Sequence, residues 1–154
     1  MARNKTVFFI DMDGTIADFY HDPDCLTKMM EKGYFENLPA MSFATAINDL
    51  ALKNEVYILS ACVNTTFCET EKANWIEKNL PNIRKSNMIF CSVGENKADI
   101  VKQRLGIKKI RKNHVLIDDY TANLLQWKDA GGTGIKKLNG MNNKSGNWKG
   151  AVAL

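Results

Sequence analysis

Apolar and polar residues follow one another along the chain in an order that predicts strands alternating with helices. Several short apolar runs are rich in β-branched and aromatic residues without strict alternation, which is typical of strands covered on both faces. We predict strands at residues 6–10, 55–60, 88–92 and 115–117, and a last edge strand at 135–138. Apolar periodicity and flanking breaker residues predict helices at about 25–32, 42–51, 66–79, 97–105 and 121–130.

Capping residues sharpen the expected helix boundaries. Asp22 can cap the first helix with Pro23 at its first position, and Ser42 can cap the second. Thr66 and Glu69 have the spacing of a capping box for the third helix. Gly106 is placed to end the fourth helix.

This order of elements predicts an α/β, Rossmann-like parallel sheet with right-handed crossovers and helices on both faces. A chain of 154 residues fits a single domain with one core. In such sheets ligands gather at the carboxyl ends of the strands. Chemistry-bearing residues follow these strand ends: Asp11, Asp13, Ser60, Lys97, Asp118 and Asp119.

Asp11 and Asp13 form the most informative pair at this rim. Side chains alternate along an extended strand, so both carboxylates can point the same way with Met12 turned aside. Two acids at one strand end are costly unless a cation lies between them. A polar turn is one alternative, because Asp-Gly favours turns. A calcium-binding loop is another, but residues 15, 16 and 22 all lack the side chains it requires.

Composition narrows the protein class without deciding it. The net charge of +4 is modest and does not by itself demand a nucleic-acid partner. The four cysteines are scattered without a CxxC pair, so we expect reduced thiols and a cytoplasmic location. No signal peptide is evident, and no stretch approaches the roughly 18 apolar residues of a membrane span.

The predicted rim has the residue types of a phosphoryl-transfer site. Three or four converging carboxylates favour a hard divalent cation, most simply Mg²⁺, and the lack of a His or Cys cluster argues against zinc. A hydroxyl and a lysine beside such a cation can bind a phosphoryl group while a carboxylate attacks phosphorus. The chemistry expected from these residues is therefore phosphate ester hydrolysis.

Four motifs together resemble the haloacid dehalogenase-like phosphatases over most of the chain. These motifs are Asp-Met-Asp-Gly-Thr at 11–15, Ser60, a lysine before the fourth strand, and Leu-Ile-Asp-Asp at 116–119. More narrowly, residues 11–19, 35–39 and 135–140 resemble the 5'(3')-deoxyribonucleotidases. This resemblance implies Mg²⁺-dependent hydrolysis of (deoxy)nucleoside monophosphates.

The resemblance also implies roles for the two acids of the first motif. Asp11 would be the nucleophile that forms an aspartyl-phosphate. Asp13 would protonate the leaving oxygen and then deprotonate water, for which its pKa must lie well above the ordinary value of about 3.9. We expect crowding by Asp11 and by the substrate's charge to raise it.

The remaining motif residues would hold the phosphoryl group and the metal. Ser60 would donate a hydrogen bond to the phosphoryl oxygens and Lys97 would neutralise them, with Lys102 as the substitute if the helix begins later. Asp119, Asp11 and the carbonyl of Asp13 would bind Mg²⁺, and Asp118 would assist, through a water. Alternatively, Ser60 is an ordinary turn residue, and the acids at 118–119 only complement a helix dipole.

Residues 16–41 would form a small cap over a core made of residues 1–15 and 42–154. Phe19, Tyr34 and Phe35 are candidates to bind the base, the alternative being that they only pack the cap onto the core. The insert is shorter than the cap of the animal enzymes. Residues 61–64 also lack the proline and the basic residue that the family often shows there, so one phosphate contact is missing.

Two further functions compete with the nucleotidase. A phosphatase of the same mechanism could act on a sugar phosphate or on a nucleic-acid 3' end, which basic residues at 102–112 could approach, although a solvated surface explains them better. A nucleotide-binding module without turnover would not need the second acid of the Asp11 and Asp13 pair. We therefore expect a small phosphomonoester as partner, no membrane, and a loosely packed tail at 139–150.

Overall fold

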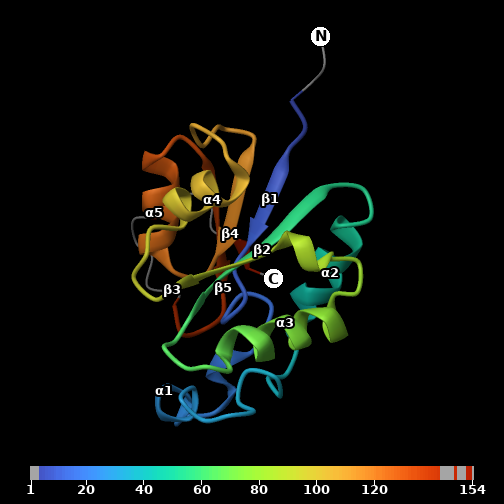
Figure 1. Cartoon of the computed structure of the whole chain (residues 1–154), viewed down its shortest axis with the longest axis vertical. Helices are drawn as coiled ribbons and strands as arrows, with labels where there is room; N and C mark the ends of the chain where they lie inside the picture. The colour runs from blue at the N-terminus through green and yellow to red at the C-terminus, as the bar shows by residue number, and fades with distance from the viewer. Residues whose placement is uncertain (1–3, 143–147, 149–151, 154) are drawn as a thin grey trace.

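A parallel β-sheet forms the centre of this computed structural model, which describes residues 4–142, 148 and 152–153. Within these residues the strand order is β3-β2-β1-β4-β5-β6, and each neighbouring pair is parallel (Figure 1). The strands are β1 (Val7–Ile10), β2 (Glu55–Cys62), β3 (Met88–Ser92), β4 (His114–Asp118), β5 (Thr133–Leu138) and β6 (Val152–Ala153).

Helices cover both faces of this sheet. They are α1 (Cys25–Lys28), α2 (Ser42–Leu50), α3 (Cys68–Asn79), α4 (Lys97–Leu105) and α5 (Thr121–Asp129), with short 3₁₀ turns η1 (Phe19–His21) and η2 (Lys85–Asn87). On one face Ile10 and Ile58 pack in a cluster with α2 and α3, and on the other Phe9 and Leu59 pack with α4 and α5. Adjacent strand residues thus enter opposite layers, as the two-residue period requires (Figure 1).

The predicted α/β, Rossmann-like fold is confirmed, and the differences lie at the ends of elements. The strand predicted at 135–138 is not an edge, because β6 pairs with its Lys137 and Leu138. Strand β2 continues to Cys62, two residues further than predicted, since it stays paired with β3.

Three of the predicted helix caps do not form. Asp22 forms a turn before α1 by accepting the amide of Asp24, and α1 then ends at Lys28 rather than at residue 32. Helix α2 is preceded by Met41, not capped by Ser42, because the amide of Met41 donates to the carbonyl of Ile16 and holds the backbone extended. The capping box does not form, since the hydroxyl of Thr65 accepts the amide of Cys68 instead.

The insert at 16–41 leaves the sheet after β1 and returns close to where it left. Ala17 and Ala40 form an antiparallel bridge, and the amide of Asp18 donates to Pro39. Figure 1 shows its helix α1 beyond the carboxyl ends of the central strands, on the side of α3. The insert is thus placed at the rim that carries the candidate site.

All four cysteines are free thiols, and Cys25, Cys68 and Cys91 are buried. Among the described residues, no helix combines the length and the apolar character needed to cross a membrane.

Candidate active site

Strand β1 delivers Asp11 to the middle of the rim. The amide of Asp11 donates to Ile117 at 2.9 Å and so continues the pairing with β4. The chain then turns sharply, because the carbonyl of Met12 accepts the amides of residues 15, 16 and 17 at 3.0–3.2 Å. Met12 is fully buried, while Asp13 lies at the cavity with Asp11.

Lys97 lies buried between two of the predicted acids. Its Nζ donates to Oδ1 of Asp11 and to Oδ2 of Asp118, each at 2.8 Å. Burial lowers the pKa of this ammonium, but the two carboxylates raise it more, so that the net pKa is above the ordinary lysine value. Lys102 instead pairs with Asp99 on the helix surface at 2.8 Å, so the structure brings Lys97 to the rim and not Lys102.

Position 97 follows from the start of α4. The side chain of Asn96 accepts the amides of Ala98 and Asp99 at 3.0 and 3.3 Å, which is the geometry of an N-cap. The helix begins at Lys97 and ends at Leu105, before Gly106, which adopts the left-handed conformation, as the sequence predicts. The lysine is therefore fixed by a capped helix that faces the end of β4.

Three buried carboxylates converge beside this lysine. Ligand atoms of Asp11, Asp118 and Asp119 lie within 4.8 Å of one another. The hydroxyl of Thr15 approaches Oδ2 of Asp11 at 3.2 Å and Oδ1 of Asp119 at 3.5 Å, so these two oxygens face the same place. Burial, and then the charges of Asp11 and Asp118, raise the pKa of Asp119 to about 8.

This donor set fits a hard divalent cation. It offers oxygen atoms only, which is the ligand type that such a cation prefers. One lysine offsets only part of the negative charge of the three acids, and a cation such as Mg²⁺ would offset the remainder. The oxygens of Asp118 already accept from Lys97, Asn123 and the amide of Tyr120. Those of Asp119 accept from the hydroxyl of Thr15 and from the side-chain amides of Asn139 and Asn142.

A second lysine, which the sequence did not indicate, lies at the end of β2. Lys72 of α3 is fully buried, and its Nζ donates to Oδ2 of Asp13 at 2.5 Å, to Oγ of Ser60 at 3.0 Å and to the carbonyl of Ala61 at 2.5 Å. Burial raises the pKa of Asp13, and the charge of Lys72 opposes that shift. Burial is thus the first cause of this shift, ahead of crowding by Asp11.

The start of the tail also reaches the site, contrary to the prediction of loose packing. Oδ2 of Asp119 accepts from the amide groups of Asn139 at 2.8 Å and Asn142 at 2.6 Å. Asn142 also donates to the hydroxyl of Tyr20 at 3.0 Å. Residues 143–147 and 149–150 of the predicted tail lie outside the described residues.

The site opens into a cavity of about 370 Å³. Its wall includes the acids and Lys97, with further residues from η1, the β3–α4 loop and the start of α5: Tyr20, Val93, Gly94, Glu95, Tyr120, Asn123 and Gln126. Ser60 is 1% exposed beneath this wall and reaches the site through its contact with Lys72.

The structure does not bring the three predicted base-binding aromatics to this cavity. Phe19 and Phe35 are buried, with ring centroids 6.2 Å apart, and Tyr34 packs against both. The hydroxyl of Tyr34 donates to the carbonyl of Phe19 at 2.6 Å. In this geometry they form the core of the insert, and Tyr20 is the residue of this aromatic group that lines the cavity.

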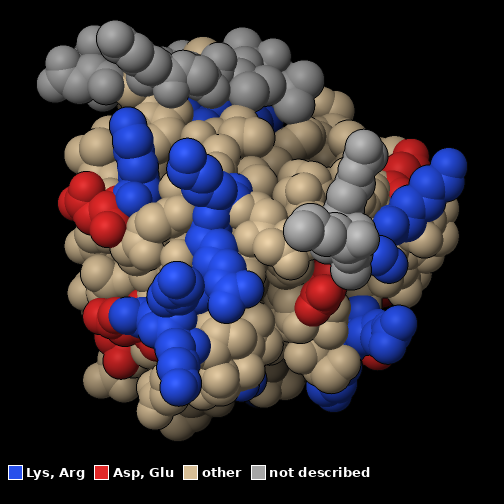
Figure 2. Space-filling model, turned by 90° about the horizontal axis from the view of Figure 1, so that it is seen from above, with Lys and Arg blue, Asp and Glu red and all other residues tan. Residues whose placement is uncertain are grey.

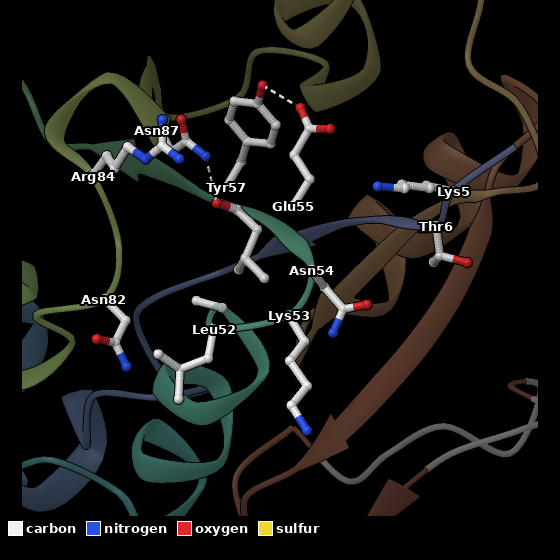
Figure 3. Close-up of a pocket in the computed structure, with 12 residues that line it drawn as sticks. Lys5, Thr6, Leu52, Lys53, Asn54, Glu55, Tyr57, Asn82, Arg84 and Asn87 are labelled. Carbon is white, nitrogen blue, oxygen red and sulfur yellow. Dashed lines mark hydrogen bonds between the residues drawn. The ribbon is translucent and has the colours of Figure 1, made fainter.

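A larger depression, of about 720 Å³, lies at the opposite, amino-terminal edge of the sheet (Figure 3). Its charged side chains include Lys5, Lys53, Glu55 and Arg84, and Glu55 accepts a hydrogen bond from Tyr57. Figure 3 shows these groups spread around the edge of this depression rather than converging on one point. The carboxylate cluster therefore marks the smaller cavity as the candidate active site.

Comparisons with solved structures identify the fold of this chain. No family model matches the chain, and no curated protein shows significant sequence similarity to it. Among solved structures, D,D-heptose 1,7-bisphosphate phosphatase from Burkholderia thailandensis matches with a TM-score of 0.64 at 10% identity, covering 97% of this chain and 92% of that one. The chain has the haloacid dehalogenase-like fold.

Further structures agree with this assignment of the haloacid dehalogenase-like fold. A family IA hydrolase from Entamoeba histolytica matches with a TM-score of 0.64 at 12% identity, covering 97% of this chain and 92% of that one. A haloacid dehalogenase-like protein from Streptococcus pneumoniae matches with a TM-score of 0.58 at 14% identity, covering 87% and 85%. The broader sequence resemblance is thus confirmed at the level of the fold, and the narrower one, to the 5'(3')-deoxyribonucleotidases, stays a prediction.

Proposed function

We propose that this protein is a phosphoric monoester hydrolase that works through an aspartyl-phosphate on Asp11. The observation that supports the proposal is that two neighbouring carboxylates have different surroundings. Asp11 lies against Lys97 in the acidic cluster, whereas Asp13 contacts a different lysine, Lys72, at the same cavity. Such unlike environments support unlike roles for two acids of one site.

The reaction runs in two displacements. A carboxylate oxygen of Asp11 attacks phosphorus, the bond from phosphorus to the ester oxygen breaks, and Asp13 gives its proton to that leaving oxygen. Asp13 then takes a proton from water, whose oxygen attacks phosphorus and breaks the bond to Asp11, releasing phosphate. The raised pKa of Asp13, which burial causes first, supports a proton on this carboxyl before the first step.

Other rim residues hold the phosphoryl group in this proposal. Lys97 neutralises the phosphoryl oxygens, and the hydroxyl of Ser60 donates to them. Asp11, Asp119 and the carbonyl of Asp13 would hold Mg²⁺, with Asp118 assisting through a water. The bound cation would supply positive charge that offsets the charge of the phosphoryl oxygens.

The proposed substrate is a small phosphomonoester, with a deoxynucleoside monophosphate first. A cavity of about 370 Å³ suits a small ligand, and the insert at 16–41 would act as its cap. A sugar phosphate is the second candidate, because Glu95, Asn123 and Gln126 on the wall offer partners for hydroxyl groups.

A nucleic-acid 3' end is less favoured by the position of the basic residues. The loop at 107–113 carries exposed Lys108, Lys109, Arg111 and Lys112. The hydroxyl of Thr133 donates to the carbonyl of Lys112, which ties this loop to the amino-terminal edge of the sheet. Figure 2, which looks onto this end of the molecule, shows Lys and Arg side chains gathered in a band there.

Phosphate release in the presence of Mg²⁺ tests the proposal. The panel contains 5' and 3' deoxynucleotides, ribonucleotides and sugar phosphates, and the proteins are wild type, Asp11→Asn and the exposed-site control Asp49→Asn. We expect selective release from deoxynucleoside monophosphates, lost by roughly 10³-fold or more in Asp11→Asn only. Release from sugar phosphates alone would move the substrate, and release from no ester would overturn the proposed function.

A further inference from the structure

The buried ammonium of Lys72 has no part in the chemistry described so far. It is 0% exposed and does not line the cavity. Its three acceptors are the Oδ2 of Asp13, the Oγ of Ser60 and the carbonyl of Ala61, and the ring of Phe35 lies 4.5 Å from Nζ on another side. An ammonium has three N–H donors, so this set of acceptors uses all of them and leaves none for a substrate.

We propose that Lys72 is a positioning residue, which fixes the orientation of the Asp13 carboxyl and turns the Ser60 hydroxyl hydrogen toward the phosphoryl group. This inference rests on the proposed function of the same site. A charge buried this deeply is costly unless it is fully paired. Moving any of the three acceptors away from Lys72 would therefore cost free energy, and this keeps them in place.

The two oxygens of Asp13 differ because of this contact. Oδ2 lies 2.5 Å from the ammonium, whereas Oδ1 is buried and has no hydrogen-bond partner among the described residues. The contact with Lys72 therefore fixes how the carboxyl group of Asp13 lies at the cavity.

The same ammonium orients Ser60. Since Lys72 donates to the Oγ of Ser60 at 3.0 Å, that oxygen acts as an acceptor in this contact. Its single hydrogen must then point elsewhere, and it is available to donate to a phosphoryl oxygen. One lysine thus sets both the acid and the hydroxyl that the proposed reaction uses.

Lys72 is itself held by the insert. The Phe35 ring packs against its ammonium, the indole of Trp75 on the same helix donates to the carbonyl of Leu38 at 2.7 Å, and Glu71 accepts the amide of Gly33. Phe35 therefore contacts the charged group behind Asp13. This gives a buried aromatic residue of the insert a role at the site without contact with a base.

Leaving-group dependence tests the positioning role. Lys72→Met and the exposed control on the same helix, Lys78→Met, are compared on an alkyl phosphate, whose leaving oxygen needs a proton, and on 4-nitrophenyl phosphate, whose leaving group departs as an anion. We expect Lys72→Met to lose kcat on the alkyl ester by about 10²-fold or more, at least about tenfold more than on the aryl ester, with little change in KM. Equal losses on both esters would overturn the proposal.

Crystal structures supply a readout that does not depend on activity. In Lys72→Met we expect the carboxyl of Asp13 and the hydroxyl of Ser60 to leave their present positions, and unchanged positions would overturn the proposal. If Lys72→Met does not fold, Lys72→Gln, which keeps two N–H donors without the charge, takes its place in both measurements. If the wild type cleaves neither ester, the proposed function fails, and the side-chain positions alone decide the role of Lys72.

Discussion

Gly14 shows how closely single residues of the site are fitted to one another. Its φ of +78° lies in the left-handed region, and a Cβ at this position would lie 2.4 Å from Oδ2 of Asp119 and 2.8 Å from Nδ2 of Asn139. Glycine is therefore required twice, once by the backbone turn after Asp13 and once by the carboxylate packed against it.

This fit predicts a specific defect in Gly14→Ala. We expect the variant to lose about 1–3 kcal/mol of unfolding free energy from backbone strain and to bind Mg²⁺ more weakly because Asp119 is displaced. Gly106→Ala is the matched control, since its φ of +62° is also left-handed but nothing lies within 4 Å of a Cβ there. Urea unfolding and calorimetric titration with Mg²⁺ measure both effects, and equal Mg²⁺ affinity in the two variants would contradict the prediction.

The residues that could be predicted from the sequence lie at or near the carboxyl end of a strand. Asp11 directly follows β1, Ser60 lies near the end of β2 and Asp118 is the last residue of β4, and parallel strands place such positions at one edge of the sheet. Lys72 and Asn142 gave no such signal, because their approach depends on how a helix and the chain after β5 pack over the rim. From the sequence alone, a polar side chain in the middle of a helix is predicted to face solvent, because its tertiary neighbours are not known.

At the scale of elements, helix α3 and the insert behave as one unit. Trp75, Glu71 and Asn74 of α3 contact the insert at Leu38, Gly33 and Glu36. These hydrogen bonds follow successive positions along both segments. The insert is therefore held against the core by a helix that also carries Lys72.

We expect Trp75→Phe to loosen the insert selectively. The change leaves the buried carbonyl of Leu38 without the indole donor, at a cost of about 1–3 kcal/mol. Trp127→Phe is the control, since its indole also donates to a backbone carbonyl, that of His114 at 3.0 Å, but on the other face of the sheet. Both variants should lose stability, whereas only Trp75→Phe should be cut faster by trypsin at Lys28 or Lys32. Similar cleavage rates would argue against the contact.

Element boundaries were predictable where local signals agree and were missed where tertiary bonds override them. Asn96 before α4 and Gly106 after it satisfy the helix ends with their own groups, so α4 lies where its sequence places it. Ser42 is a good capping residue in isolation. The hydrogen bond from Met41 to Ile16 makes Met41 the residue before the helix in place of Ser42, and sequence periodicity carries no information about that partner.

At the scale of the whole molecule, the parallel sheet separates two ends with different chemistry. The carboxyl ends of the strands gather the acids, whereas the amino ends carry the basic loop at 107–113 (Figure 2). His114 begins β4 at the basic end and is half-buried. Its Nδ1 accepts the amide of Arg111 at 3.1 Å, an arrangement that requires the neutral ring.

His114 therefore predicts a loss of stability on acidification that is independent of the site. Burial, and then the charge of Arg111, lower its pKa below the ordinary value of 6.5. The unfolded chain takes up the proton first as the pH falls through 6.5, so the contribution of this group is present above that pH and is lost below it. Unfolding free energies from urea titrations at pH 8, 6.5 and 5 should fall more steeply for the wild type than for His114→Gln. Because the acids of the site are present in both proteins, their titration cancels in the difference, and parallel pH slopes would show that His114 is not held neutral by the fold.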